Sequence, residues 1–281
     1  MRWTPGDRGN IEDRRGSSAR MGAMPLGIGG VLVLLVLSWF TGVDFLSLLG
    51  GGGAPQTESA GASSPVTASP EEEKMVDFVD AVMADTQSTW GELLRGRYQP
   101  TTAVLFREAT NSTCGFAQSA VGPFYCPADR KVYLDLSFFN ELRTRFGAPG
   151  DFAQAYVLAH EVGHHVQAVT GTEQRVRQLQ GSNPGQRNQL SVLMELQADC
   201  YAGVWGHAAA RPGGKVDLDA DDLEEGLRAA SAIGDDTIQK RSTGRVMPDK
   251  FTHGSSEQRV TWFRRGFQSG DPNACKTFEQ Q

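Results

Sequence analysis

The stretch from His160 to His164, His-Glu-Val-Gly-His, constrains the fold of this chain more than any other five residues. On an α-helix, residues four apart lie on one face, about 6 Å from each other. A helix here would let His160 and His164 reach one metal ion, while Glu161 points about 100° round the helix axis. The chain has five histidines, and three of them lie between positions 160 and 165. The competing interpretation is a core helix whose histidines are there by chance.

The surrounding sequence predicts that helix. Asp151 followed three residues later by Gln154 matches a capping box, and Gly171 ends the pattern. The residues between them are rich in Ala, Val and Leu, and Glu161 is the only carboxylate from Phe152 to Thr170. Most faces of the helix should therefore be buried, and a buried carboxylate needs a positively charged partner.

Two histidines do not complete a catalytic zinc site, which has three protein ligands and one position open to water. A second apolar helical stretch, from Asn188 to Gly206, carries only two charged residues, Glu195 and Asp199. These acids are four residues apart and repel each other, more strongly when they are buried. We predict that Glu195 is the third zinc ligand and that Asp199 accepts the ring N–H of a zinc-bound histidine. The alternative is a partly exposed helix with two solvated acids.

These motifs resemble known peptidases. A His-Glu-x-x-His motif followed by Glu-Leu-Gln-Ala-Asp on a later helix is similar to the gluzincins, of which thermolysin is the best known. Over about residues 74–281 the chain resembles the bacterial family of putative neutral zinc metallopeptidases. The motifs that carry this resemblance are Cys114-Gly115, Gly122 to Pro127, Val132 to Asp135, His160 to His165 and His253 to Arg259. The resemblance implies Zn²⁺ as cofactor and a zincin-like α+β domain, mostly helical with a small sheet.

The function that follows is zinc-dependent endopeptidase activity. In this interpretation a zinc-bound water attacks the peptide carbonyl, and Glu161 is the general base. Gluzincins resemble one another in having a donor that steadies the developing oxyanion, and His253 is the candidate here. The Thr252-His253-Gly254 segment is similar to the Thr-His-Pro segment of CAAX-processing zinc peptidases, with Gly254 in place of proline. A purely structural role for His253 stays open.

Two segments have the pattern of β-strands, residues 102–106 and residues 130–135. Zincin-like folds place an edge strand beside the cleft, where an extended peptide can add through main-chain hydrogen bonds. The resemblance implies this role for residues 130–135, which precede the histidine helix. An ordinary position inside the sheet is the alternative.

The N-terminal part predicts a membrane anchor. Residues 24–43 form an uncharged run of about 20 residues, long enough for a hydrocarbon core of about 30 Å and too long for a signal-peptide core. Before this run, five arginines stand against three acids, which leaves a net charge of +2. The positive-inside rule then makes residues 1–23 a cytoplasmic segment and puts everything after Val43 outside the cell membrane.

The rest of the chain divides into two parts. Residues 44–73 have the Gly-, Ser- and Pro-rich composition of a flexible linker, and residues 74–281 are long enough for one metallopeptidase domain. A formal net charge of −6 argues against nucleic acid as a partner. The expected partners are a peptide or protein substrate and a membrane, reached through residues 24–43.

Four cysteines fit a location outside the cell membrane, because an even number in an oxidising compartment favours disulfides. Cys114 and Cys126 flank a glycine-containing loop and are predicted to pair. This leaves Cys200 to pair with Cys275. Ligation of zinc by cysteine is the competing interpretation, although the chain has no Cys-x-x-Cys motif.

A second class of function stays open, a catalytically silent zinc-containing module that binds or scaffolds other molecules outside the membrane. Structural zinc sites are closed by four protein ligands and need no carboxylate base. The presence of Glu161, together with only three predicted ligands, favours the enzyme.

Overall fold

The computed structural model describes residues 1–17, 66–219 and 221–279 of the chain. The predicted anchor, residues 24–43, and most of the predicted linker lie outside the described residues. In the part that is described, no helix combines the length and the apolar character needed to cross a membrane.

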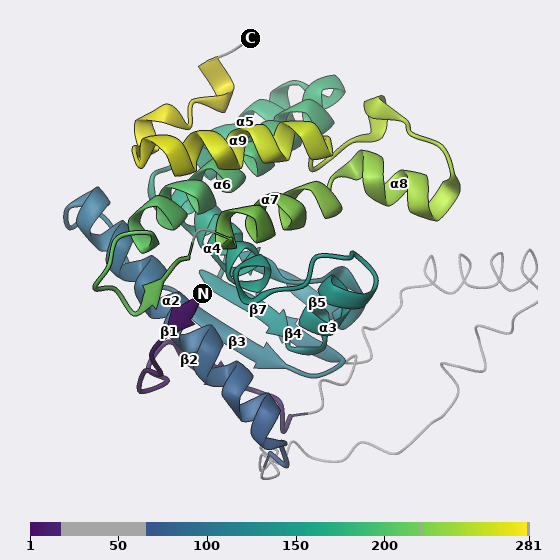
Figure 1. The fold of residues 1–281 in the computed structure, drawn as a ribbon. Coiled ribbons are helices and arrows are strands. Elements are labelled where there is room, and N and C mark those ends of the chain that lie inside the picture. The colour runs from purple at the N-terminus through teal and green to yellow at the C-terminus, as the bar shows by residue number, and fades with distance from the viewer. Residues whose placement is uncertain (18–65, 220, 280–281) are drawn as a thin grey trace, which may run out of the picture.

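The fold joins a small sheet to a larger helical layer (Figure 1). The central sheet has the strand order β2-β3-β7-β6, in which β6 alone runs antiparallel to its neighbour. Its strands are β2 (Ile11–Asp13), β3 (Thr102–Phe106), β7 (Lys131–Asp135) and β6 (Phe124–Cys126). Two shorter pairs are β1 (Arg2–Trp3) with β8 (Val216–Asp217), and β4 (Ala109–Ser112) with β5 (Gly115–Gln118).

Helices make up most of the described chain. They are α2 (Pro70–Leu94), α3 (Ser137–Thr144), α4 (Asp151–Val169), α5 (Thr172–Ser182), α6 (Arg187–Ala209), α7 (Asp222–Ala232), α8 (Asp235–Thr243) and α9 (Ser256–Ser269). Helix α4 packs against β6 and β7 on one side and against α6 and α7 on the other. The prediction of a mostly helical α+β fold with a small sheet is therefore confirmed.

Helix α4 carries the two histidines and begins differently from the prediction. Asp151 is its first helical residue rather than its cap, and the N-cap position is Gly150, with φ 116°. The carboxylate of Glu225, from α7, accepts the backbone N–H of Phe152 at 3.1 Å. A long-range contact therefore replaces the predicted local capping box, because the start of α4 packs against α7.

Glycines set how closely α4, α6 and α9 approach one another. A Cβ at Gly163, inside the histidine motif, would lie 3.0 Å from the carbonyl oxygen of Ala198 on α6. Where α6 meets α9, a Cβ at Gly203 or Gly266 would overlap the backbone of the opposite helix. Small residues at these crossings let α6 lie against both neighbours, which brings its acidic residues to the histidines of α4.

Both predicted disulfides are present. Cys114–Cys126 ties the turn between β4 and β5 to the end of β6, and Cys200–Cys275 ties the C-terminal segment to α6. The second bridge starts one residue after Asp199, so it fastens the helix that carries the acidic pair.

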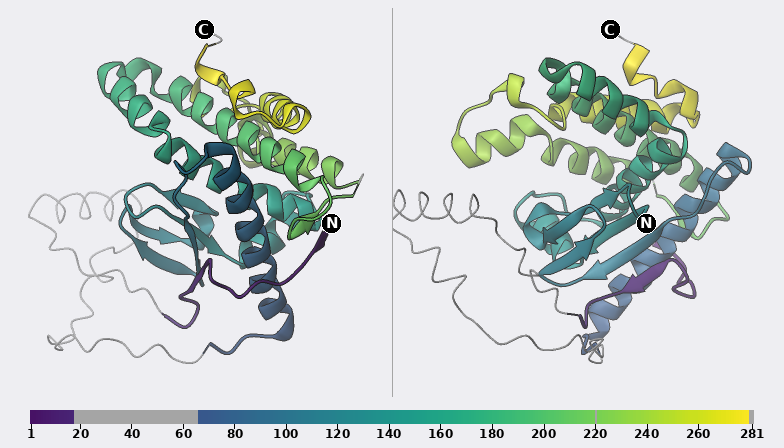
Figure 2. Two further views of the ribbon diagram at one scale, coloured as in Figure 1. Left: turned by 90° about the vertical axis from the view of Figure 1, so that its left-hand side faces the viewer. Right: turned by 180° about the vertical axis from the view of Figure 1, so that it is seen from behind.

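The N-terminal residues differ from the prediction. Residues 1–17 belong to the folded domain, since β1 pairs with β8 and β2 lies parallel to β3 at the edge of the central sheet. Figure 2 shows this segment running beside the sheet and α2. Arg8 and Arg15, which the prediction counted as a free basic flank, form ion pairs with acidic residues of α2. Counting charges in a sequence does not reveal such partners.

Two predicted domain boundaries change as a result. The segment 1–23 is not separate from the domain over its described part, residues 1–17. At the other boundary, Ser69 caps α2 and accepts the N–H of Glu72, so residues 70–73 are helix rather than linker.

The pairing of β2 with β3 also bears on the predicted membrane topology. A single crossing between β2 and β3 would put these paired strands on opposite sides of a membrane, so the pairing and the predicted single-pass topology exclude each other.

Candidate metal centre

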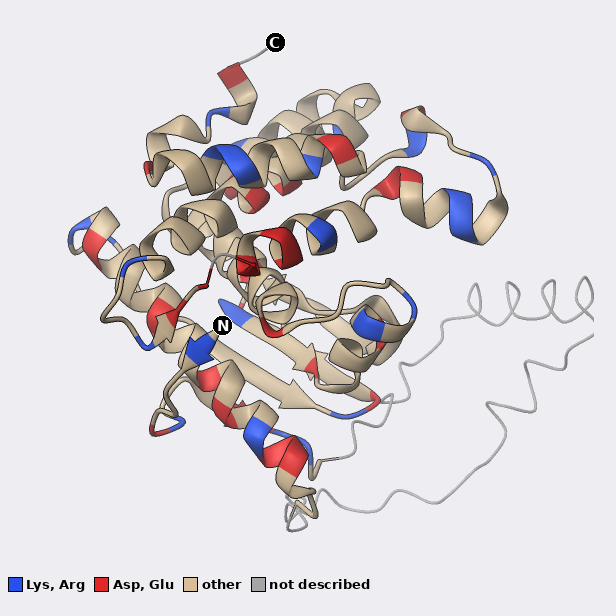
Figure 3. Cartoon of the chain, in the orientation of Figure 1, with Lys and Arg blue, Asp and Glu red and all other residues tan. Residues whose placement is uncertain are grey.

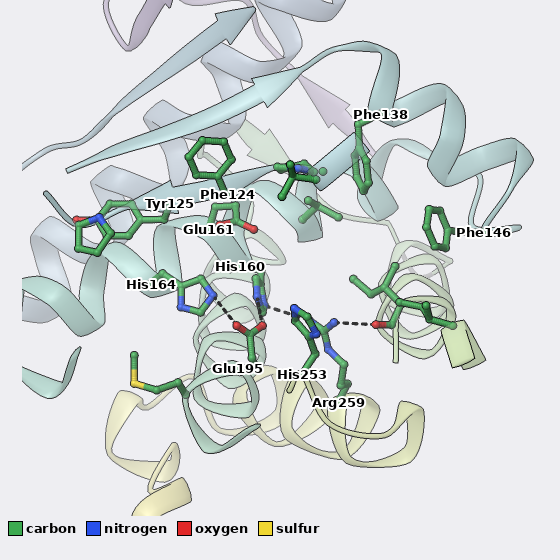
Figure 4. A pocket seen from close by; sticks show the side chains of 18 of the residues that line it. Phe124, Tyr125, Phe138, Phe146, His160, Glu161, His164, Glu195, His253 and Arg259 are labelled. Carbon is green, nitrogen blue, oxygen red and sulfur yellow. Dashed lines mark hydrogen bonds and ion pairs between the residues drawn. The ribbon is translucent and has the colours of Figure 1, made fainter. Parts of the chain in front are cut away.

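His160, His164 and Glu195 come together between α4 and α6. One ligand atom from each lies within 4.8 Å of the other two. The Nε2 atom of His160 is 3.1 Å from one Glu195 carboxylate oxygen, and the Nε2 atom of His164 is 3.4 Å from the other. Figure 4 shows the three side chains facing one another. Their sequence spacing on two helices leads to this arrangement, because i and i+4 on α4 share the face that α6 covers.

Hydrogen-bond partners set the orientation of both imidazoles. His160 Nδ1 lies 2.8 Å from Asp199 Oδ1, and His164 Nδ1 lies 2.9 Å from Gln167 Oε1. The amide nitrogen of Gln167 donates to the carbonyl of Met194, which leaves its oxygen to face His164. Each Nδ1 therefore donates a proton to an oxygen, and each Nε2 is left to bind a cation. Two imidazole nitrogens and a carboxylate oxygen in this arrangement fit Zn²⁺.

Asp199 is the centre of a buried polar network. Arg259 on α9 donates to both of its carboxylate oxygens at 2.8 Å, and the Tyr156 hydroxyl donates to Oδ1 at 2.5 Å. Burial alone would raise the pKa of Asp199, but the charges of Arg259 and His160 hold that pKa below its usual range. Asp199 thus stays charged and keeps the proton on His160 Nδ1. The sequence predicted this place for Asp199, but not the contacts of Tyr156 and Gln167 or the pairing of Arg259.

The ligands themselves are strongly coupled. Burial disfavours a charge on His160, yet the charge of Asp199 and the hydrogen bonds to Asp199 and Glu195 raise its pKa to about 10. Burial would raise the pKa of Glu195, but the neighbouring histidines bring it well below its usual range. In the metal-free protein, protons on the histidines therefore neutralise the acids, and a metal ion must displace them on binding.

Glu161 lies beside the three ligands without being one of them. Its side chain is 7% exposed and lines the same cavity, which has a volume of about 500 Å³. In Figure 4, Glu161 and Glu195 lie on different sides of His160. The cavity holds a carboxylate that is free to act on a bound molecule.

His253 lines the same cavity, and its side chain is half exposed. Asp235, at the start of α8, holds this histidine in place. One oxygen of Asp235 accepts the backbone N–H groups of Thr252, His253 and Gly254 at 2.7, 2.7 and 3.1 Å, and the other lies 3.2 Å from His253 Nδ1. The hydrogen bond to Asp235 raises the pKa of His253 despite the opposing effect of burial. Asp235 was missed, because its partners are 17 to 19 residues away in the sequence.

The strand beside the cavity is not the one that the resemblance implied. Strand β7, within the predicted 130–135 segment, lies inside the sheet between β3 and β6. The edge strand is β6, and Phe124 and Tyr125 from it line the cavity. The assignment to residues 130–135 was therefore wrong. The three-residue β6 is too short for an alternating pattern to mark it.

Comparison with known proteins agrees with this site. Residues 1–278 match the model of the family described as putative neutral zinc metallopeptidase, so the chain belongs to this family and Zn²⁺ is the metal of the site. The matched range includes the N-terminal strands. The uncharacterized protein YpfJ of Escherichia coli K12 is 48% identical over 99% of both chains. The uncharacterized protein Rv2575 of Mycobacterium tuberculosis H37Rv is 45% identical over 68% of this chain and 66% of its own. No solved structure matches the chain.

Proposed function

We propose that this member of the family is a zinc-dependent endopeptidase in which Glu161 is the general base. The observation that carries the proposal is a buried carboxylate beside a three-ligand site, at the wall of an open cavity. A structural zinc site is closed by four protein ligands and has no use for such a base. Among the described residues, the group that can hold the metal comprises His160, His164 and Glu195.

The proposed mechanism assigns each side chain one task. Zinc, when bound, polarises the peptide carbonyl and lowers the pKa of water toward neutrality. Glu161 accepts the proton of the attacking water and delivers it to the leaving nitrogen. His160 stays a neutral ligand because its Nδ1 proton is held by Asp199, whose charge is balanced by Arg259.

His253 is the proposed donor to the developing oxyanion. It lines the cavity, and its Nδ1 faces Asp235, which leaves Nε2 as the atom able to donate. A raised pKa favours the protonated imidazole, which is the better donor to a negative oxygen. The backbone hydrogen bonds from residues 252–254 to Asp235 fix the position of the ring before the substrate binds.

The cavity walls indicate how a peptide would lie. An extended chain can add to the free edge of β6 through main-chain hydrogen bonds. Phe138 and Phe146 line the part of the cavity away from His164 (Figure 4). We infer that this part accepts an apolar side chain of a peptide or protein substrate.

The location is part of the same proposal. The apolar residues 24–43 support attachment to a membrane, and the two disulfides support a catalytic domain outside the cytoplasm. The formal charge of −6 argues against nucleic acid as a partner. Because β2 pairs with β3, residues 1–17 would lie on the same side of the membrane as this domain.

Cleavage of a peptide library by the full-length protein tests the proposal. Glu161→Gln should lower the rate by about 10²- to 10⁴-fold, the usual contribution of a general base, while zinc stays bound. Glu257→Gln is the matched control, since Glu257 lies exposed on α9. Chelation should abolish cleavage, and added zinc should restore it. Stoichiometric zinc with no cleavage by the wild type would contradict the proposal and favour the silent binding module.

A further inference from the structure

The segment from Asp235 to His253, which we call the α8 lobe, leaves the domain between α7 and α9 and returns to it. Its two ends are fastened together at the base. A Cβ at Gly234 would overlap Ser256, and the Asp236 carboxylate accepts the backbone N–H of Ser256 at 2.7 Å. The far end is open, because all ten residues from 241 to 250 are exposed. The lobe lies at the right-hand end of the helical layer in Figure 1.

Exposed apolar side chains gather on this lobe. Ile238, Val246 and Met247 are 38%, 44% and 38% exposed. They are three of the seven large apolar side chains that are exposed in the described part of the chain. Two of them, Val246 and Met247, are neighbours in the exposed stretch from residue 241 to residue 250, which we call the tip of the lobe, so apolar surface faces water there.

Basic residues surround the tip. Residues 238–250 contain four basic side chains, Lys240, Arg241, Arg245 and Lys250, against one acid, Asp249, which leaves a net charge of +3 in a chain of charge −6. Figure 3 shows these basic positions on α8 and in the loop that follows it. None of the four is within ion-pair distance of an acidic side chain of residues 1–17, 66–219 or 221–279. Arg241 donates one hydrogen bond to the carbonyl of Arg145 at 2.9 Å, and no acid neutralises the four charges within the described residues, so they can attract an anionic partner.

Internal hydrogen bonds hold the tip in this form. The Gln239 side-chain oxygen accepts the backbone N–H of Met247 at 2.7 Å, and the Thr243 hydroxyl donates to the carbonyl of Arg245 at 3.1 Å. The lobe thus presents Val246 and Met247 outward between basic residues, as a folded loop.

We propose that the α8 lobe binds the surface of an anionic lipid bilayer. Apolar side chains that enter the boundary between headgroups and acyl chains, with basic residues facing anionic headgroups, are the features of interfacial membrane binding. A bilayer surface suits this tip better than an acidic protein does, because two exposed apolar side chains, Val246 and Met247, stand among the basic residues and can enter the lipid. The apolar residues 24–43 of the sequence favour the same choice.

Membrane contact by the lobe would also set where the metal site lies relative to the lipid surface. Ile238 belongs both to the exposed face of the lobe and to the lining of the cavity that holds His160 and Glu161. His253 stands at the base of the lobe, on the same cavity. A lobe bound to the bilayer therefore brings the mouth of the cavity to the lipid surface. This inference is independent of whether the protein cleaves peptides.

A fluorescent probe on the lobe tests the proposal in the full-length chain. All four cysteines are in disulfides, so a nitrobenzoxadiazole probe can be placed on Met247→Cys alone. Leu93→Cys is the matched control, since Leu93 is 37% exposed and lies at the end of α2, away from the lobe (Figure 1). The protein is mixed with vesicles of phosphatidylcholine, with or without phosphatidylglycerol. We expect a blue shift of the emission and quenching by doxyl-labelled lipid at position 247, with the anionic vesicles only.

A charge-reversed variant completes the test. Replacing Lys240, Arg241, Arg245 and Lys250 by Glu should abolish the shift at position 247, while zinc content and circular dichroism stay those of the parent. Three results would overturn the proposal: no shift with anionic vesicles, an equal shift with neutral vesicles, or an equal shift at position 93. A shift on adding poly-glutamate but not vesicles would also overturn it, in favour of an acidic polypeptide partner.

Discussion

Two clusters of arginine and carboxylate hold distant parts of the chain together, and they differ in their contact with water. In the metal centre, the side chains of Arg259 and Asp199 are 3% and 0% exposed. At the N-terminal segment, Arg15 is 1% exposed, but its partners Asp13, Glu72 and Glu73 are 24 to 37% exposed. The contacts are similar in number and length. What differs is whether the acids can turn to water when the arginine is lost.

This difference separates two tasks. Asp199 has protein partners on both oxygens, so its charge and position are fixed, and through it the orientation of a zinc ligand. The N-terminal cluster, Arg15 with its acidic partners, orients no metal ligand. It fastens residues 1–17 to α2 and the sheet. A buried ion pair such as Arg259–Asp199 fixes the positions of its side chains, but removing both charges from water costs free energy. A half-exposed ion pair holds two segments together, and added salt weakens it.

The largest effect expected for the N-terminal cluster is all-or-none. Thr4→Cys and Ser88→Cys place exposed thiols on the N-terminal segment and on α2. Because β2 pairs with β3, a membrane-impermeant maleimide should label both positions from the same side of the membrane. Labelling from opposite sides would show that residues 1–17 do not join this sheet and would support the predicted single crossing. Detergent-solubilised protein, in which both thiols must react, is the control.

The next effect concerns the buried cluster. Arg259→Met should lower the free energy of unfolding by about 3–5 kcal/mol, because it leaves the Asp199 charge buried without its partner. Zinc affinity should fall by about 10- to 100-fold, the usual effect of losing a group that orients a ligand. Denaturant unfolding in the presence of a chelator and competition with a zinc-binding dye measure the two quantities. Asp199→Asn in the same chain should recover part of the stability, and an Arg259→Met protein as stable as the wild type would contradict the comparison.

Arg15→Ala should lower the free energy of unfolding by a smaller amount, about 1–2 kcal/mol, since the acidic partners of Arg15 are partly solvated already. This loss should shrink as salt is added, because exposed charges are screened. Arg107→Ala serves as the reference: Arg107 is 40% exposed and pairs with Glu72 as well, so its loss should cost about 0–1 kcal/mol. A cost for Arg15→Ala as large as that of Arg259→Met would remove the distinction between the clusters.

The same contrast explains which features could be predicted from the sequence. Helical periodicity placed His160 and His164 on one face, because i and i+4 spacing fixes a common face whatever the rest of the fold does, and two like charges in an apolar stretch pointed to Glu195. Asp235 and the pairing of β2 with β3 could not be predicted in this way. Each depends on partners brought together only by the complete fold, and a three-residue strand carries too little pattern of its own.

The pair of His253 and Asp235 is less buried than the Arg259–Asp199 cluster and lies beside the cavity, unlike the N-terminal cluster. Changing this pair should have the smallest effect on stability. The pKa of His253 is raised, so this residue stabilises the fold below its unfolded pKa of 6.5, and the contribution is lost as pH rises through the folded value. The pKa of Asp235 is lowered from 3.8: burial opposes this change, while His253 and the backbone N–H groups drive it. Its contribution is present above pH 3.8 and is lost as pH falls through the folded value. The pair therefore stabilises most between these limits.

Proton NMR of the His253 ring measures this pair directly. In Asp235→Asn the pKa of His253 should drop, because burial then acts without the opposing carboxylate. Asp236→Asn is the matched control, since Asp236 bonds Ser256 rather than the histidine. An unchanged His253 titration in Asp235→Asn would mean that Asp235 fixes only the backbone of residues 252–254. In that case the ring would be free to turn, and its proposed role as a pre-positioned donor to the oxyanion would fail, while Glu161 as base would be unaffected.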